Sequence, residues 1–369
     1  MRTRALINIK QLKQNYLALS QMREPAHTIM PVIKAHAYGH DALIVAKALD
    51  KLNPVAFGVA DLNEALEIGH LKLKTPCFNF GYIDPLLLHE SIQQKVILSL
   101  FCLEDIAYLG TISAQLKAQL RLHIKVDTGM NRIGFKKNQW SAVIELIDQH
   151  DLKHAIQGIF THLSDSNQLN FEHSQRQLDQ FSQAKIFFEQ ALNKKLTTHC
   201  ASSSPVQHLS SLISSFDWIR PGIALYGYPY QQNPNIKPIL TWKAKIIQIK
   251  DVAVGESIGY NQSYIAAKPM RIGIISVGYG DGFFKEYHNH TLYYKNEPCP
   301  IVGDICMDMC MIDLSNIKEA LLGDEVFLIS EKKCNDTLHL SQQTNKSVYE
   351  ILTSIGKRVV REATSDKKS

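Results

Sequence analysis

Eight short apolar runs rich in β-forming residues alternate with helical patterns across the first 228 residues of the chain. The runs lie near residues 30–35, 55–60, 77–80, 96–100, 121–127, 155–163, 197–202 and 218–226. The helical patterns between them lie over residues 42–52, 63–71, 85–93, 104–116, 139–149 and 171–192, with a shorter connection near 205–212. Such alternation predicts an α/β fold with a parallel sheet. An open doubly wound sheet and a closed barrel both fit, and the count of eight favours a (β/α)8 TIM-type barrel.

The pattern changes after Tyr228, where a polar, turn-rich segment covers residues 229–235. The strand-forming runs beyond it lie near 239–249, 271–277, 291–294, 300–305, 311–314 and 325–329, and one helix is expected over 348–355. We therefore expect an N-terminal barrel over residues 1–228 and a C-terminal mostly-β domain over residues 229–369. Residues 2–9 alternate as a strand does, and this strand could join the C-terminal domain.

Composition and charge exclude several classes of function. Of the 369 residues, 45% are hydrophobic and 20% are charged, as in an ordinary globular protein. The net charge of +5 is not gathered in a basic block, so neither nucleic acid nor a membrane is expected as a partner. No apolar run reaches the roughly 18 residues that span a bilayer, and the N-terminus lacks the apolar core of a secretory signal. The seven cysteines are scattered without a Cys-x-x-Cys pair, which favours a cytoplasmic location and gives no metal site.

Lys34 interrupts the apolar run from Pro31 to Ala35, shortly before Gly39. Burial of an ammonium group disfavours its charged form, so a lysine at the end of a buried strand tends to lose its proton. A neutral lysine is the nucleophile that reacts with a carbonyl cofactor. The competing interpretation is a lysine that extends from the strand end into solvent.

Four further segments place polar groups at expected strand ends, where barrel enzymes carry their chemistry. Arg132 follows a glycine-containing turn and suits a carboxylate or phosphate clamp, although an ion pair with Asp127 is as common an arrangement. His162 ends an apolar strand, where a core histidine is also expected. Ser203 lies within three consecutive serines, a composition typical of phosphate cradles and of helix caps. The turn Arg220-Pro-Gly-Ile223 would present backbone N–H groups where barrels recurrently bind phosphate.

Taken together, these segments resemble the alanine racemase family from residue 2 to about residue 361. The matching segments follow the family's order and are Val-Ile-Lys-Ala-His-Ala-Tyr-Gly-His (32–40), Lys-Val-Asp-Thr-Gly-Met-Asn-Arg-Ile-Gly (125–134), Thr-His-Leu (161–163), Arg-Pro-Gly-Ile-Ala-Leu-Tyr-Gly (220–227), Gly-Glu-Ser-Ile-Gly-Tyr (255–260), Val-Gly-Tyr-Gly-Asp-Gly (277–282) and Cys-Met-Asp-Met (306–309). The resemblance implies a pyridoxal-phosphate-dependent isomerase of fold type III, which interconverts L- and D-alanine and supplies D-alanine for peptidoglycan.

The resemblance also implies how the cofactor would be held. Lys34 would bind the cofactor aldehyde covalently. Arg220 would face the pyridine nitrogen, and His162 would lie along the ring and hydrogen-bond to Arg220. The phosphate would be bound by Tyr38, Ser203, Gly222 and Ile223.

The family's remaining motifs assign the groups that act on the substrate. Racemisation removes a proton from one face of Cα and returns one to the other, so two proton-transfer groups are needed. The resemblance implies that these are Lys34 and Tyr260, with Arg132 beside Tyr260 and Met307 at the substrate carboxylate. Lys125 matches a position that is carbamylated in many members. Because two chains exchange active-site residues in the family, a homodimer is implied in which Tyr260 and Met307 reach the partner's Lys34.

The chain departs from the family pattern at a few positions, and other activities remain open. Lys357 stands where some members have a tyrosine that contributes to the phosphate site, Ser202 where asparagine is common, and Asn131 where glycine often occurs. The alternatives are a racemase of another small amino acid such as serine, a decarboxylase on the same type of barrel, or a non-catalytic cofactor-binding barrel. The presence of Tyr260 and Met307 argues against the last of these.

Overall fold

The computed structural model describes residues 2–22, 28–164, 172–200, 216–229, 232–331 and 335–364. The chain divides into two compact units. We call the unit made of Lys13–Ala37 and Ala42–Lys237 the barrel unit. The unit made of Met1–Leu12, Tyr38–Asp41 and Pro238–Ser369 is called the β-unit. The short segment 38–41 therefore belongs to the β-unit although the chain on both sides of it belongs to the barrel unit.

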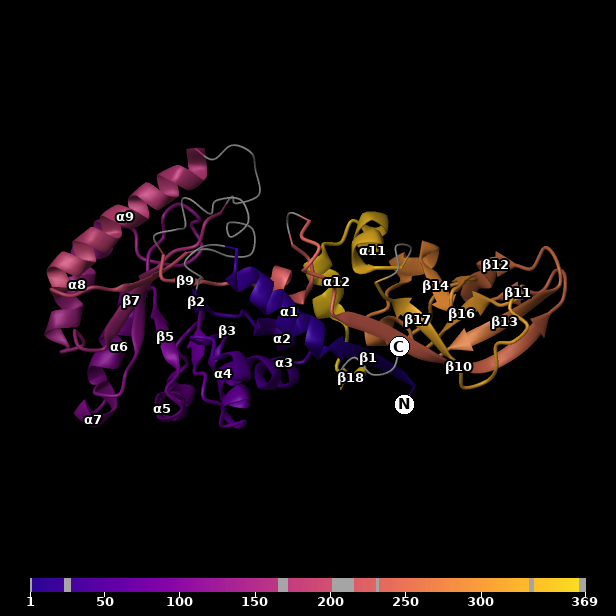
Figure 1. Ribbon diagram of the computed structural model, residues 1–369, viewed down its shortest axis with the longest axis horizontal. Helices are drawn as coiled ribbons and strands as arrows, with labels where there is room; N and C mark the ends of the chain where they lie inside the picture. Colours follow the sequence, from indigo (N-terminus) through magenta and orange to yellow (C-terminus); the bar gives the residue numbers. More distant parts are fainter. Residues whose placement is uncertain are drawn as a thin grey trace. The chain divides into compact units, whose positions relative to one another are not determined.

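Eight parallel strands form the sheet of the barrel unit (Figure 1). They are β2 (Thr28–Ile29), β3 (Phe57–Val59), β4 (Cys77–Asn79), β5 (Ile97–Leu100), β6 (Leu122–Lys125), β7 (Ile156–Phe160), β8 (Thr197–His199) and β9 (Trp218–Ile219). Their order is β2-β9-β8-β7-β6-β5-β4-β3. The sheet closes because Val32, just after β2, forms a parallel bridge with Gly58 in β3. The expectation of a (β/α)8 barrel is thus confirmed.

Helices surround these strands (Figure 1). They are α3 (Ala42–Leu49), α4 (Leu62–Gly69), α5 (Pro85–Gln93), α6 (Leu103–Thr111), α7 (Ala114–Lys117), α8 (Trp140–Gln149) and α9 (Glu172–Leu192). Strands covered on both faces need apolar side chains in both directions, and every residue of β3, β4, β5 and β6 is buried. Inside the unit Met30, Phe78, Ile97 and Phe160 pack in one apolar cluster.

The β-unit is built on the long strand β10 (Leu240–Val252), as Figure 1 shows. The N-terminal strand β1 (Thr3–Asn8) runs antiparallel to β10 and parallel to the last strand β18 (Val360–Thr364). The other strands are β11 (Ser257–Ile258), β12 (Tyr264–Ile265), β13 (Met270–Ile275), β14 (Thr291–Tyr294), β15 (Glu297–Pro300), β16 (Cys310–Asp313) and β17 (Glu325–Ile329). The C-terminal domain is therefore mostly β, as expected.

Several local expectations were wrong. The run 218–226 contains only the two-residue strand β9, and residues 223–226 form the 3-10 helix η4 (Ile223–Tyr226). The strand expected at 300–305 lies earlier, as β15. Besides α12 (Val348–Ser354), the β-unit contains a second helix, α11 (Thr337–Thr344), whose start is capped by the Asp336 carboxylate. The helical connection expected near 205–212 lies outside the described residues. None of the helices in the described ranges has the length and hydropathy needed to cross a membrane.

Candidate active site

Lys34 is followed by a turn of unusual backbone conformation. The short element α2 (Lys34–Tyr38) is not a right-handed helix, because Ala35, His36, Ala37 and Tyr38 all have φ angles between 51° and 55°. Such left-handed backbone costs L-residues about 1–2 kcal/mol each and is found where surrounding contacts enforce it. The expectation that Lys34 ends a strand is corrected: β2 ends at Ile29, and Lys34 opens this left-handed turn.

Five basic side chains of the barrel unit interact electrostatically: Lys34, Lys125, Arg132, His162 and Arg220. Lys125 ends β6 and Arg132 lies in the loop after it, whereas Lys34, His162 and Arg220 follow β2, β7 and β9. The parallel sheet therefore brings together residues that are far apart in the sequence. The acidic groups that act on these lysines are Asp127, which raises the pKa of Lys125, and Glu64, which raises the pKa of Lys34. The cluster therefore carries excess positive charge.

Burial, together with this charge, lowers the pKa of the two lysines. Burial, followed by the charges of Arg220 and Arg132, lowers the pKa of Lys125 to about 7, and Lys125 is only 6% exposed. Lys34 also has a lowered pKa, caused first by desolvation and then by Arg132. Its side chain is solvent-exposed in the single chain, so screening by water limits this lowering. Both amines are thus shifted towards the neutral, nucleophilic form.

Arg220 is a buried cation with neutral partners. Its guanidinium donates to the backbone oxygens of Thr161 at 2.7 Å and Cys200 at 2.8 Å, and to Nδ1 of His199 at 2.8 Å. A longer bond of 3.3 Å joins it to Nδ1 of His162. Burial lowers the pKa of Arg220 to about 10, which leaves it fully charged at neutral pH.

The buried His123 holds the ring of His199 in place. Nε2 of His199 lies 3.0 Å from Nδ1 of His123, and the pKa of both imidazoles is lowered, mainly by burial. Because Nδ1 of neutral His199 accepts from Arg220, its Nε2 must carry the proton and donate to His123. The two rings stack on Trp218 with centroid distances of 5.3 Å. Arg220 is therefore fixed by a chain of neutral acceptors rather than by a carboxylate.

The four residues expected to bind the phosphate lie in different parts of the chain. Gly222 and Ile223 are buried at the start of η4. Ser203 lies outside the described residues. Tyr38, in the β-unit, is buried and packs against the ring of Tyr349 of α12 at a centroid distance of 6.0 Å. Lys357, which stands where some family members have a tyrosine, is exposed.

The β-unit carries Tyr260 and Met307 on exposed positions. Tyr260 opens a short 3-10 helix, η5 (Tyr260–Gln262), and is 67% exposed, while Met307 is 53% exposed. The loop with Met307 is held by the glycine-rich segment 278–282, because the N–H groups of Tyr279 and Gly280 donate to the backbone oxygens of Cys306 and Met307 at 3.0 and 2.9 Å. A Cβ on Gly278 would lie 2.1 Å from the Cys306 oxygen, so only glycine permits this approach. Within this segment the chain forms a 3-10 turn, η6 (Tyr279–Asp281).

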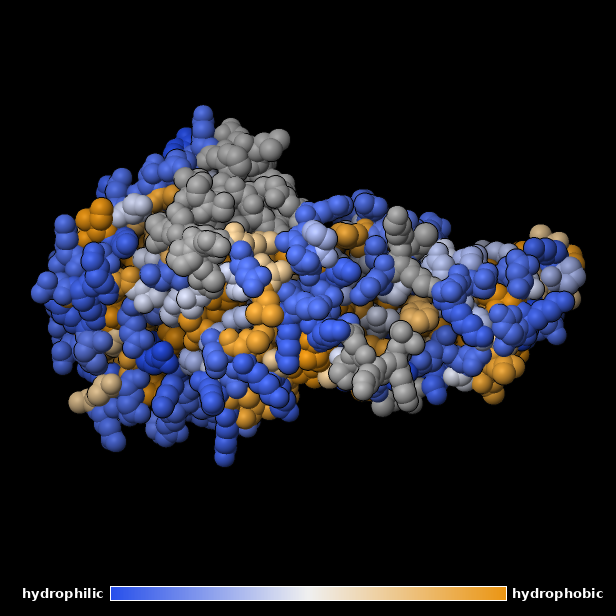
Figure 2. Space-filling view, viewed as in Figure 1, coloured by the Kyte–Doolittle hydropathy of each residue, from blue (hydrophilic) through white to orange (hydrophobic). Residues whose placement is uncertain are grey.

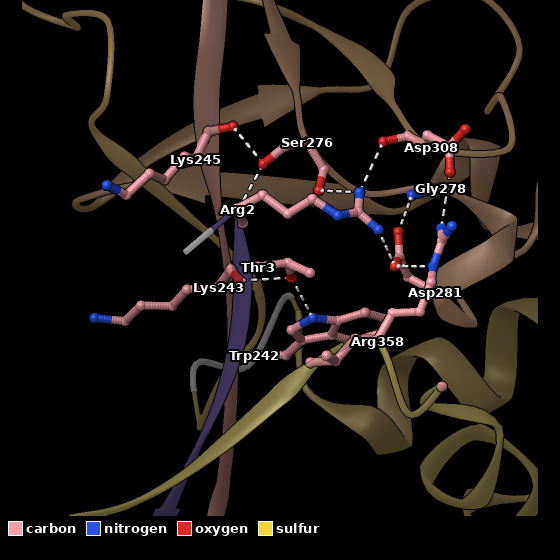
Figure 3. Close-up of polar contacts among 12 residues, drawn as sticks. Arg2, Thr3, Trp242, Lys243, Lys245, Ser276, Gly278, Asp281, Asp308 and Arg358 are labelled. Atoms are coloured by element: carbon pink, nitrogen blue, oxygen red, sulfur yellow. Dashed lines mark hydrogen bonds and ion pairs between the residues drawn. The ribbon is translucent and has the colours of Figure 1, made fainter.

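A buried carboxylate organises the same region (Figure 3). Asp281 is fully buried and accepts hydrogen bonds from Arg2, from Arg358 at 3.1 Å and from the Gly278 N–H at 3.1 Å. Arg358 also binds the Asp308 carboxylate at 2.9 Å. The N-terminal strand, the C-terminal segment and the Met307 loop therefore meet at Asp281.

We expect Asp281→Asn to lower the free energy of unfolding by roughly 2–4 kcal/mol, because two arginines lose their anionic partner at a buried site. Urea unfolding of the purified protein measures this change. Asp308→Asn is the matched control, since Asp308 contacts the same Arg358 but is 50% exposed, and its effect should stay below about 1 kcal/mol. Equal effects of the two substitutions would contradict the prediction.

Hydrophobic residues reach the surface at the end of the β-unit that carries β11 and β12, as Figure 2 shows. Tyr260, Val254 and Ile265 are 67%, 62% and 50% exposed, respectively. Clustered exposed apolar side chains are typical of a surface that another molecule covers.

The donor set of the barrel unit fits pyridoxal phosphate. The compound is an anion with an aldehyde and a pyridine ring; the cluster supplies an amine with lowered pKa in Lys34, excess positive charge, and a fixed guanidinium in Arg220. A carbonyl-reactive lysine within a cationic cluster is the chemistry such a cofactor requires. No group of three or more metal-binding side chains occurs within the described ranges.

Two contacts were missed by the sequence analysis, one beside Lys34 in the barrel unit and one in the β-unit. Glu64 accepts the Ala35 N–H, but its position three residues after Asp61 resembles an ordinary helix-capping pattern. Tyr349 meets Tyr38, but more than 300 residues separate them and no local pattern connects them. Neither contact has a signal in a single sequence.

Comparison with known proteins identifies the family of the chain. The chain matches the model of the alanine racemase N-terminal domain over residues 7–229 and that of the C-terminal domain over residues 239–363. It is 30% identical to alanine racemase 1 of Caldanaerobacter subterraneus subsp. tengcongensis, over 97% of this chain and 94% of that protein.

Two solved structures extend the likeness to three dimensions. Alanine racemase of Clostridium difficile 630 has a TM-score of 0.91 and 28% identity, over 100% of this chain and 97% of that chain. Alanine racemase of Bartonella henselae, solved with covalently bound pyridoxal phosphate, has a TM-score of 0.82 and 28% identity, over 99% of this chain and 100% of that chain. With matching family models over both of its parts and relatives along its whole length, this chain belongs to the alanine racemase family.

Proposed function

We propose that this protein is a pyridoxal-phosphate-dependent racemase that interconverts L- and D-alanine in the cytoplasm and supplies D-alanine for peptidoglycan. The observation that carries the proposal is the cluster of Lys34, Lys125, Arg132, His162 and Arg220 in a chain of this family. The six cysteines in the described part of the chain are free thiols, as is usual in a reducing compartment. The domain boundaries of 1–228 and 229–369 stay a prediction.

Each residue would perform a separate task. Lys34 would hold the cofactor, Arg220 would donate to its ring nitrogen with His162 beside it, and the phosphate would be bound by Tyr38, Ser203, Gly222 and Ile223. When bound, the cofactor supplies a ring that stabilises the negative charge left on Cα after its proton departs. Lys34 Nζ would move the proton on one face and the Tyr260 hydroxyl on the other. Arg132 and Met307 would orient the substrate carboxylate.

The direct test is to incubate the protein and cofactor with L-alanine and to follow D-alanine by chiral chromatography. L-Serine serves as the comparison, and faster racemisation of serine would favour the alternative substrate. Cofactor binding at Lys34 without a D-isomer from either amino acid would favour the non-catalytic cofactor-binding alternative and would overturn the proposal.

We further propose a homodimer in which Tyr260 and Met307 complete the partner's site. The exposed side chains near β11 and β12 support this proposal, because apolar groups on a surface favour association. Mixing Lys34→Ala with Tyr260→Phe subunits tests it: each mixed dimer would contain one site with both changes and one with neither. Such mixing should restore about a quarter of wild-type activity. An active monomer in size-exclusion chromatography, or mixtures that stay inactive although subunits exchange, would contradict it.

Arg220 should control the type of reaction as well as its rate. Because burial lowers the pKa of Arg220 only to about 10, the guanidinium keeps its protons at neutral pH and would leave the cofactor nitrogen without one. In Arg220→Glu, the new carboxyl group would share a proton with the ring nitrogen of the cofactor. This variant should raise transamination during turnover, while racemisation falls roughly 100-fold. Pyruvate formed from alanine measures the side reaction. Arg220→Lys keeps the charge and should not raise it; an unchanged pyruvate yield in Arg220→Glu would count against this role.

Lys125 should react with carbon dioxide. Its pKa of about 7 leaves much of the amine neutral at neutral pH, and a carbamate would place negative charge beside Arg132 and Arg220. The modification should increase from about pH 6 to about pH 8, because protonation of the amine blocks it. NMR with 13C-labelled bicarbonate detects the carbamate, and Lys125→Met should remove a signal that Lys47→Met retains. A signal that persists in Lys125→Met would assign the modification elsewhere.

A further inference from the structure

The left-handed turn after Lys34 needs an external hydrogen-bond partner at its start. Within the turn, the Ala37 N–H donates to the Ile33 oxygen at 2.8 Å. The Ala35 N–H donates instead to Oε1 of Glu64 at 2.6 Å. Ala35 is the first left-handed residue and directly follows Lys34, so this bond fixes the backbone from which the Lys34 side chain extends.

The second carboxylate oxygen of Glu64 is engaged on the barrel. Oε2 accepts the N–H of Ala60, the residue directly after β3, at 2.8 Å. In a capping box Glu64 would instead accept the N–H of Asp61, the residue that caps α4. Both oxygens are thus used outside the helix, and one carboxylate ties the Lys34 turn to the end of a buried barrel strand.

Charge supports the same assignment. Glu64 raises the pKa of Lys34, against the lowering by desolvation and by Arg132. Hydrogen bonds from backbone N–H groups to a carboxylate are stronger than those to a neutral amide. A glutamine at position 64 would have only one acceptor oxygen for the two N–H groups.

We propose that Glu64 is a positioning residue for Lys34: its two carboxylate oxygens hold the strained turn against β3 and thereby aim the catalytic amine. The proposal rests on the proposed function, in which Lys34 binds the cofactor and transfers a proton. Because Glu64 acts through the backbone of Ala35, its loss should reduce kcat more than it changes KM.

The test compares Glu64→Gln and Glu64→Asp with the wild type and with Glu67→Gln, an exposed position on the same helix. The apoprotein is mixed with pyridoxal phosphate at a series of pH values. The rate of attachment to Lys34 is followed by borohydride trapping and peptide mass spectrometry. Attachment requires the neutral amine, so its pH profile reports the pKa of Lys34 independently of turnover.

Glu64→Gln should move the attachment profile to lower pH and reduce kcat roughly 10- to 100-fold. Glu64→Asp keeps the charge but reaches less far, so it should keep the wild-type profile while kcat falls. Glu67→Gln should match the wild type in both. If Glu64→Gln matches Glu67→Gln, the positioning role is overturned while the proposed function stands. If the wild type itself neither binds the cofactor at Lys34 nor racemises alanine, both are overturned.

Discussion

Lys34→Ala is expected to abolish covalent attachment of the cofactor and to reduce racemisation by about 10⁴-fold or more. The substitution removes two functions at once, because Lys34 is both the nucleophile that binds the cofactor and one of the two proton-transfer groups. Each function contributes about 10²–10⁴-fold to the rate. Borohydride trapping measures the first loss, and production of D-alanine from L-alanine measures the second. The fold should persist, because Lys34 is exposed and removal of a cation from a positive cluster leaves no buried group unpaired.

A control separates this loss from a general disturbance of the basic cluster. Lys125→Met changes a second amine of the same cluster but leaves the nucleophile in place, so cofactor attachment should survive it. Added methylamine can replace the missing amine of Lys34→Ala as a proton acceptor, and partial recovery of activity would support the assigned role. Cofactor that remains covalently bound to Lys34→Ala would assign the attachment to another lysine.

Tyr260→Phe is expected to reduce racemisation by roughly 10²–10⁴-fold while cofactor attachment stays unchanged. The phenol hydroxyl alone is lost, and Lys34 remains able to move the proton on its own face. In deuterated water the variant should therefore still exchange the Cα hydrogen of one alanine enantiomer but scarcely that of the other. Mass spectrometry of each recovered enantiomer measures this asymmetry.

The exchange experiment distinguishes two proton-transfer groups from one. If Lys34 served both faces, Tyr260→Phe would exchange both enantiomers at similar rates, and the two-group proposal would be wrong. Tyr264→Phe is a suitable control, because Tyr264 lies in the neighbouring strand β12 and packs on the apolar cluster of the β-unit. It should retain exchange of both enantiomers.

Much of the fold could be predicted because it depends on patterns that repeat locally. Each barrel strand is a short apolar run, and each helix between strands has its own apolar period, so the eightfold alternation was recognisable from the chain. Errors arose where strands are very short. β2 and β9 are each only two residues long. The apolar run after β2 continues as a single bridge at Val32, and the run after β9 continues as the 3-10 helix η4.

The candidate site could be predicted in part for a related reason. Lys34, Lys125, Arg132, His162 and Arg220 each lie near the end of an expected strand run or shortly after it, and strand ends on one side of a parallel barrel lie close together. The bonds from Arg220 to the oxygens of Thr161 and Cys200 could not be predicted, because a backbone oxygen acts as an acceptor wherever the fold brings it.

By itself, the sequence determined the alternating barrel, the mostly-β C-terminal part and the types of chemical group at the strand ends, because these depend on side-chain periodicity and residue chemistry. Only the tertiary structure decided the left-handed turn at Ala35, the carboxylate of Glu64 that holds it, and the packing of Tyr349 on Tyr38. Strained backbone and contacts between distant residues persist only when the whole fold supplies their partners. The strained residues and the residues that stabilise them therefore lie in different parts of the chain.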